Sequence, residues 1–249
     1  MLSLRSTLSL CAVTLLLAAW TWWTVASAAS VPAFWLGSAP LAPHLIAGFS
    51  VVIAAFVSPL FFTQVELRSD GGWIFLGKGA YAALWLAVAA AFMMTAAARI
   101  APVNASGIIG ATLWIFGVAF IALTLTRLLP RAAPALLFLW IIALPIAAYM
   151  LVEVFLTSPA GGSGLAESAA PQAAALRTAS HWMVNLSPST GTLGALTGTL
   201  PFESEFSPLL AFAEIAMLAV FLAWLTLRKR VALPLSPRER ADAGTPAAG

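Results

Sequence analysis

The chain has 249 residues, of which 61% are hydrophobic and 8% are charged, and its formal net charge is +3. A soluble domain of this size needs more charged residues to cover its surface without large apolar patches, so this composition excludes a soluble globular protein. Nucleic acid is not expected as a partner either, because the basic residues stand at the ends of apolar runs and form no stripe. The composition predicts a membrane protein whose first partner is the lipid bilayer.

Six apolar runs follow one another along the chain. Each is close to the ~20 residues that a helix needs to cross the core of a bilayer. We therefore expect an all-α, polytopic fold with six transmembrane helices. The runs lie at about 8–28, 42–64, 79–98, 106–126, 133–155 and 208–227.

The basic residues predict the orientation of these helices. Only Arg99 and Arg177 lie on one side of the six-segment pattern, and the other ten Lys and Arg residues lie on the opposite side. Basic residues near the ends of spans stay in the cytoplasm, so we expect both termini to be cytoplasmic, in the inner membrane of a bacterium. The ten are Arg5, Arg68, Lys78, Arg127, Arg131, Arg228, Lys229, Arg230, Arg238 and Arg240.

Residues 1–230 are predicted to form one transmembrane domain, followed by a disordered Pro/Ala/Gly-rich tail at 231–249. The connection at about 157–207 is the one long external loop. Its part from Ser180 to Leu200 is semi-apolar with regular small residues, which predicts short helices that lie in, or dip into, the outer leaflet. The stretch Gln64 to Lys78 is predicted to be an interfacial turn or short helix on the cytoplasmic face.

The first apolar run has two interpretations. Arg5, the apolar stretch and Ala26-Ser27-Ala28 together resemble a signal peptide with its cleavage site. The run through Trp20 is long for a signal peptide, however, and its aromatic residues suit the outer boundary of a retained helix. We expect residues 1–28 to be retained; cleavage would leave five spans in the same orientation.

Proline and histidine positions give further expectations. Pro59 and Pro145 lie inside predicted spans, and the second should bend its helix. His44 and His181 are both expected at the external face, where polar interfacial residues are the favoured interpretation. A bis-histidine haem or copper site, as in a membrane cytochrome subunit, stays open as an alternative. Cys11 is the only cysteine, so the chain has no internal disulfide and no CxxC site.

No enzymatic motif stands out, and we expect neither a catalytic residue nor a cofactor. There is no Walker A sequence, so ATP hydrolysis would need a separate subunit. Glu153 and Glu214 are the ionisable residues closest to the membrane interior, where a charge costs a few kcal/mol unless it is neutralised, paired or hydrated. They are candidates for a polar path, with Arg99 or Arg177 as possible partners, or else for structural hydrogen bonds.

The overall plan resembles the membrane subunit of ABC-2-type exporters. The stretch Trp73 to Tyr81 (WIFLGKGAY) is similar to the family's junction into the third helix, where a Gly-Lys pair precedes the span. In the external loop, Asn185, Ser187 and Pro188 are similar to the family's Asn/Ser-Pro stretch, and Leu193 to Gly198 follows.

This resemblance implies a permease that works as a homodimer or heterodimer with cytoplasmic ATP-binding subunits. The segment between the second and third helices would contact the ATPase, which gives Glu66, Asp70, Gly71, Gly72 and Trp73 a coupling role. That segment is compressed here, and the family's Pro-Arg element is absent from it. The compression favours the alternative, an accessory or structural membrane subunit of a larger complex without an ATPase.

Overall fold

Every element of the computed structural model is a helix among the residues that it describes, which are 4–30, 42–61, 71–99, 103–150, 183, 187–197 and 208–228. The predicted all-α fold is confirmed for these residues. The α-helices are α1 (Leu4–Ser30), α2 (Ala42–Val52), α4 (Gly72–Ala97), α5 (Ala105–Leu128), α6 (Ala133–Phe138), α7 (Leu144–Met150), α10 (Pro188–Thr197) and α11 (Pro208–Arg228). Two π-helical turns, η2 (Ile53–Val57) and η4 (Leu139–Ala143), and a 3₁₀ turn, η3 (Ser58–Phe61), complete the set.

Four of the helices are long and apolar enough to cross a membrane. The chain is therefore a multi-pass membrane protein. A further apolar helical segment, Ala133–Ala147, is shorter than these four. The four spans are Leu4–Ala26, Pro43–Leu60, Gly72–Ala97 and Ala105–Leu128.

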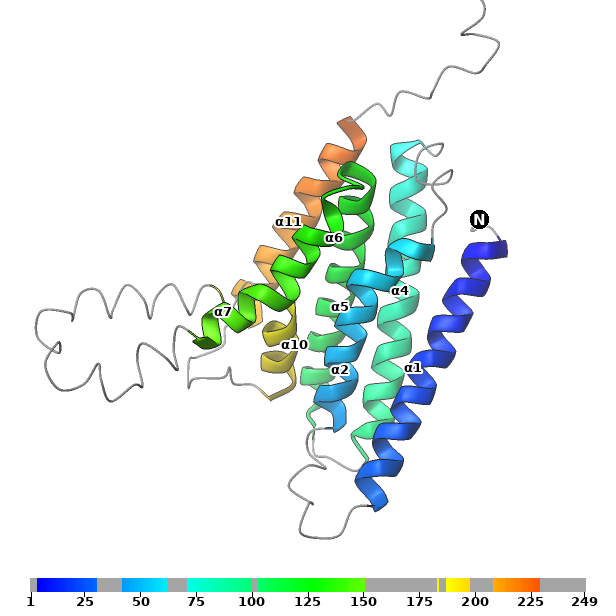
Figure 1. The fold of residues 1–249 in the computed structure, drawn as a ribbon, viewed down its shortest axis with the longest axis vertical. Coiled ribbons are helices and arrows are strands. Elements are labelled where there is room, and N and C mark those ends of the chain that lie inside the picture. The colour runs from blue at the N-terminus through cyan, green and yellow to red at the C-terminus, as the bar shows by residue number, and fades with distance from the viewer. Residues whose placement is uncertain are drawn as a thin grey trace, which may run out of the picture.

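Helix α5 lies in the middle of the bundle and contacts α2, α4, α10 and α11 (Figure 1). About half of its residues are buried. Its neighbour α4 turns a row of small side chains inward, and small residues let two helices approach closely where lipid gives no hydrophobic driving force between them. The buried alanines of α4 are Ala82, Ala83, Ala87, Ala90 and Ala97.

Helix α1 packs on α4 and α2 through one face. Leu10, Val13 and Leu17, spaced three or four residues apart, are buried on that face. The indole of Trp20 stacks on Phe49 of α2, with 4.6 Å between ring centroids. Trp85 of α4 donates a hydrogen bond from Nε1 to Thr14 Oγ1 of α1 at 3.0 Å. The first apolar run is thus an integral part of the bundle.

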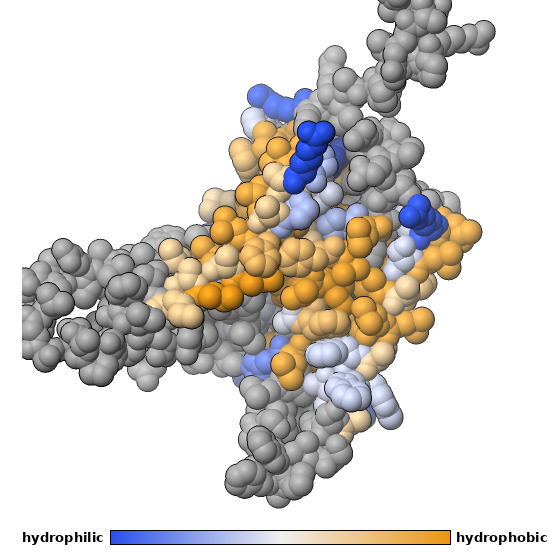
Figure 2. Space-filling model, in the orientation of Figure 1, coloured by the Kyte–Doolittle hydropathy of each residue, from blue (hydrophilic) through white to orange (hydrophobic). Residues whose placement is uncertain are grey.

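The outer surface of the bundle is apolar. Large side chains such as Trp22, Phe92 and Val220 are exposed on α1, α4 and α11. Figure 2 shows hydrophobic residues over most of the described surface on this face, while strongly hydrophilic residues gather toward the upper end. In water such a surface would be a large exposed patch, whereas lipid tails accept it.

A proline lies two residues after the end of each of the two π turns. Pro59 follows η2, and Pro145 follows η4. A proline ring clashes with the carbonyl four residues earlier and has no N–H to donate. The wider π turn accommodates this, because Ser58 and Leu144 donate their N–H groups five residues back, to the carbonyls of Ile53 and Leu139. The expected bend at Pro145 thus takes the form of a π turn.

The third predicted span begins earlier than expected. The prediction placed an interfacial turn over Gln64–Lys78 and started the span near residue 79, but α4 begins at Gly72 and runs without a break to Ala97. Phe75 N donates to Gly71 O at 2.9 Å, so the helix forms directly after Gly71. The two glycines mark the helix start, and Trp73 to Lys78 form its first turns.

Candidate functional site

The beginnings of α1 and α4 and the ends of α5 and α11 meet at one end of the bundle, which we call the basic end (Figure 1). Gly72 of α4 lies against α11, Arg127 of α5 lies over Phe75 of α4, and Thr7 of α1 lines the same hollow as Lys78 of α4. Arg5, Lys78, Arg127 and Arg228 belong to these four helix ends, and Arg131 follows α5 directly. These are five of the ten basic residues that the sequence places on one side. Arg99, at the end of α4, lies at the opposite, far end.

Gly72 brings the start of α4 into close contact with the end of α11. A Cβ atom at this position would lie 3.2 Å from the carbonyl oxygen of Thr226 and 3.3 Å from Cα of Leu227. Both atoms are backbone, so they cannot swing aside. Of the predicted coupling residues, Gly72 therefore has a clear structural role, which is to let the two helices touch.

Arg127, in the last turn of α5, lies over the ring of Phe75 in the first turn of α4. Its guanidinium carbon is 4.4 Å from the ring centroid, and both side chains are buried. A desolvated cation over an aromatic face is attracted by the quadrupole of the ring. Sequence reasoning used Arg127 only as a topological charge and missed this contact. The available signal was the Phe in the WIFLGK stretch.

The predicted coupling residue Trp73 points outward at the basic end. Its side chain is 77% exposed, and that of its neighbour Ile74 is 59% exposed. Gly71 is exposed as well, whereas Glu66 and Asp70 lie outside the described residues. Of the predicted coupling residues that the structure describes, Gly72 thus contacts α11, whereas Gly71 and Trp73 are exposed.

The predicted external-loop motif begins a short buried helix near the far end. Ser187 and Pro188 start α10, and Gly191 N donates to Ser187 O at 2.8 Å. Thr192 Oγ1 donates to Pro188 O at 2.5 Å, which satisfies a buried hydroxyl. Asn185 lies outside the described residues. The prediction of a short helix in this loop is confirmed for Pro188–Thr197.

Helix α10 packs directly on α5 through glycines of both helices. A Cβ atom on Gly191 would lie 2.5–2.8 Å from three atoms of the Trp114 indole, and one on Gly107 would lie 2.7 Å from the carbonyl oxygen of Ala195. A Cβ atom on Gly110 would lie 3.0 Å from the Cβ atom of Ala195. Sequence reasoning missed Trp114 and the glycines of α5, although Gly107 and Gly110 are spaced to share a helix face.

Glu214 is half-buried in α11, which contacts both α5 and α10. Its Oε2 atom is buried and accepts no hydrogen bond from any described residue. The next residue, Ile215, fills the space beside Gly117 of α5, where a Cβ would lie 3.2 Å from Ile215 Cγ2. Of the expected partners, Arg99 is exposed and Arg177 falls outside the described residues, as does Glu153.

No metal-binding group appears in the part of the chain that the structure covers. Three or more His, Cys, Asp or Glu side chains do not come together anywhere within it. His44 is half-buried at the start of α2, while His181 lies outside the described residues. The bis-histidine alternative therefore gains no geometric support from the residues described.

Comparison of the chain with protein-family models, with curated proteins and with solved structures finds no match in any of the three.

Proposed function

We propose that the chain is the membrane subunit of an ABC-2-type exporter in a bacterial inner membrane, with six spans and the basic end in the cytoplasm. The observation that carries this proposal is the contact of the start of α4 with α5 and α11 at the basic end. We call this contact the joint; it consists of Arg127 over Phe75 and of Gly72 against Thr226 and Leu227. Trp73 is exposed beside it. The resemblance of WIFLGKGAY and of the Asn/Ser-Pro stretch to that family supports it further. In the six-span arrangement, α6–α7 and α11 supply the fifth and sixth crossings.

The joint explains how a push from an ATPase would reach the rest of the bundle. A partner that contacts residues 62–73 moves the start of α4. Gly72 touches the backbone of α11, and Phe75 lies under Arg127 of α5. A movement of α4 alone would break these contacts, so α5 and α11 should move with it. Helix α5 in turn carries α10 near the far end, so movement passes along the whole central helix.

The energy source in this proposal is a separate protein, since the sequence has no Walker A motif. Two copies of the permease, or one copy and a related chain, would form the path between them. Glu214 is the candidate polar group in that path, because its buried Oε2 is left without a hydrogen bond from the described residues. A carboxylate oxygen that is buried without a hydrogen bond is costly, and a functional position is the default explanation for an ionisable residue inside a membrane.

The test is co-purification of an ATPase with the chain from its native membrane. Changing Glu66→Ala and Asp70→Ala together should weaken this co-purification or uncouple hydrolysis from transport, because truncating a contact that anchors an interface costs on the order of 1–2 kcal/mol or more. A matched control, Glu239→Ala with Asp242→Ala, removes the same charges from the predicted cytoplasmic tail and should change nothing. If no ATPase co-purifies with the wild-type chain, the proposal fails.

One observation favours a second candidate, an accessory membrane subunit without an ATPase. Only residues 62–71 separate η3 from α4, which leaves a short segment for docking a partner. In this case the joint at the basic end would simply hold the bundle together, and the proteins that co-purify would belong to a larger membrane complex.

A further inference from the structure

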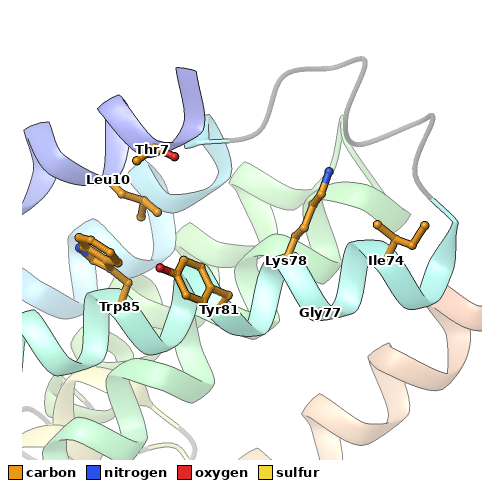
Figure 3. A pocket seen from close by; sticks show the side chains of 7 residues that line it. All are labelled: Thr7, Leu10, Ile74, Gly77, Lys78, Tyr81 and Trp85. Carbon is orange, nitrogen blue, oxygen red and sulfur yellow. The ribbon is translucent and has the colours of Figure 1, made fainter. Parts of the chain in front are cut away.

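An open groove runs between α1 and α4 from the basic end toward the middle of the bundle. One hollow of about 660 Å³ is lined by Thr7 and Leu10 of α1 and by residues of α4 that include Lys78 and Trp85. Figure 3 shows Thr7 and Leu10 facing the α4 side chains, with Lys78 nearer the start of α4 than Trp85. A second hollow of about 490 Å³ shares Tyr81 and Trp85 with the first, so the two adjoin.

The groove changes character along its length. Near the basic end its lining includes the ammonium group of Lys78 and the hydroxyl groups of Thr7 and Tyr81. Farther along α4 the lining is apolar and includes the exposed side chains of Val88 and Phe92. The lining therefore suits an amphiphile, whose charged head would lie near the basic end and whose apolar tail would lie farther along α4.

Polar groups in the middle of the groove satisfy one another. Trp85 Nε1 donates to Thr14 Oγ1 at 3.0 Å, and Thr14 Oγ1 donates to Leu10 O at 2.8 Å. An apolar chain can therefore lie across this region without removing a hydrogen bond with water. This hydrogen bond also holds the indole of Trp85, which lines both hollows.

The length of the groove matches one leaflet of a bilayer. Lys78 and Phe92 are fourteen positions apart on one helix, which corresponds to about 21 Å at 1.5 Å per residue. A bilayer is about 40–45 Å thick with its headgroup regions, so one leaflet is roughly 21 Å. A lipid whose phosphate lies at Lys78 thus ends its acyl chain near Phe92.

We propose that this groove binds one anionic glycerophospholipid from the leaflet at the basic end. The phosphate lies at the ammonium group of Lys78, beside the hydroxyls of Thr7 and Tyr81, because a lysine acts as a point charge for phosphate. One acyl chain lies along the apolar lining of α4. The inference rests on the membrane embedding and on the groove, and it stands whether or not the chain works with an ATPase.

Two substitutions separately test the charge that would hold the phosphate and the open space of the groove. Lys78→Gln removes the charge, and Arg131→Gln is its control, since it removes an equal charge from the basic end outside the groove lining. Gly77→Trp is designed to fill the groove, since Gly77 lines it and a Cβ there meets no other atom within 4 Å. Gly48→Trp is its control, on α2, where a Cβ also meets nothing within 4 Å.

The measurement is native mass spectrometry of the full chain from mixed micelles with equal amounts of palmitoyl-oleoyl phosphatidylglycerol and phosphatidylcholine. The wild type, Arg131→Gln and Gly48→Trp should carry one phosphatidylglycerol. Lys78→Gln should lose about fivefold in preference for it, as expected for one basic residue at a membrane surface. Gly77→Trp should lose the bound lipid. Gel filtration and circular dichroism verify the fold of each variant, and Gly77→Leu replaces the Trp variant if that one misfolds.

Several results would overturn the proposal. Equal retention of both lipids by the wild type shows that the headgroup is not recognised. Equal loss in Lys78→Gln and Arg131→Gln shows a general surface charge effect. Full retention in both Gly77 variants places the lipid elsewhere. A lipid-free dimer that Gly77→Trp dissociates means that a second copy of the chain, and no lipid, occupies the groove.

Discussion

Arg127 and Phe75 join the end of α5 to the beginning of α4 through a buried cation–π contact of 4.4 Å. The two residues are 52 positions apart (127 − 75), and each is within the turn of its helix that faces the basic end. The contact therefore helps to fix the rotation and the relative height of two helices whose interface also contains buried alanines and the close approach of Gly79 to Leu123.

We expect this pair to contribute measurably to stability. A double-mutant cycle of Arg127→Met and Phe75→Leu, followed by thermal or denaturant unfolding in detergent, should give a coupling of about 2 kcal/mol, the value typical of a desolvated cation–π contact. The comparison pair is Arg228 and Trp224 of α11, which are also stacked, at 4.1 Å, but exposed. Their coupling should be about 0.5–1 kcal/mol. Equal couplings for the two pairs would contradict the argument from burial.

Gly191 should not tolerate any side chain. In Gly191→Ala the new methyl group would lie less than 3 Å from atoms of the Trp114 indole, in a packed core, so α10 must shift away from α5. We expect a lower unfolding temperature for Gly191→Ala and partial recovery when Trp114→Leu is added, because the smaller side chain frees the space. Gly48→Ala, whose methyl group meets no other atom within 4 Å, serves as the neutral control. A neutral Gly191→Ala would show that α10 does not pack on α5 in this way.

The predicted topology can be mapped with reporter fusions. Fusions after Arg68, Arg131 and Arg230 should report the cytoplasm, since these basic residues belong to the side that the positive-inside rule retains. Fusions near Gly37, Asn104 and Gly162 should report the outside. An external signal at Arg131 would break the six-span arrangement, because α5 would then have to end on the wrong side.

The first helix should remain in the mature protein. The stacking of Trp20 on Phe49 and the hydrogen bond from Trp85 to Thr14 join α1 to α2 and α4, and both would be lost by cleavage after Ala28. Intact-mass measurement of the purified chain should therefore include residues 1–28. A mature N-terminus at Ala29 would establish the signal-peptide interpretation.

Sequence reasoning predicted the helices well and their contacts poorly, for a physical reason. Hydropathy reports how much of a segment is apolar, and each of the six apolar runs indeed contains helix. It does not report rotation, because a membrane helix is apolar on its lipid face and on its packed face alike. The partners of Arg127 and Gly191, Phe75 and Trp114, lie far away in the sequence, so nothing next to Arg127 or Gly191 indicated which residue each one contacts. The start of α4 was missed because the Gly71-Gly72 pair looked like the middle of a turn.

The two π turns have a consequence for how this chain can change in length. A π turn contains one residue more than the α-helical turn it replaces, and in both cases the surplus residue accommodates the proline that follows. Deletion of one residue within Leu139–Ala143 would force the Pro145 ring against a carbonyl, unless the proline were replaced as well. The surplus residue of the π turn and Pro145 are therefore coupled. A homologous chain that keeps a proline at position 145 must also keep the surplus residue. A chain that has lost this proline can lose the surplus residue as well, without rotating the rest of the helix.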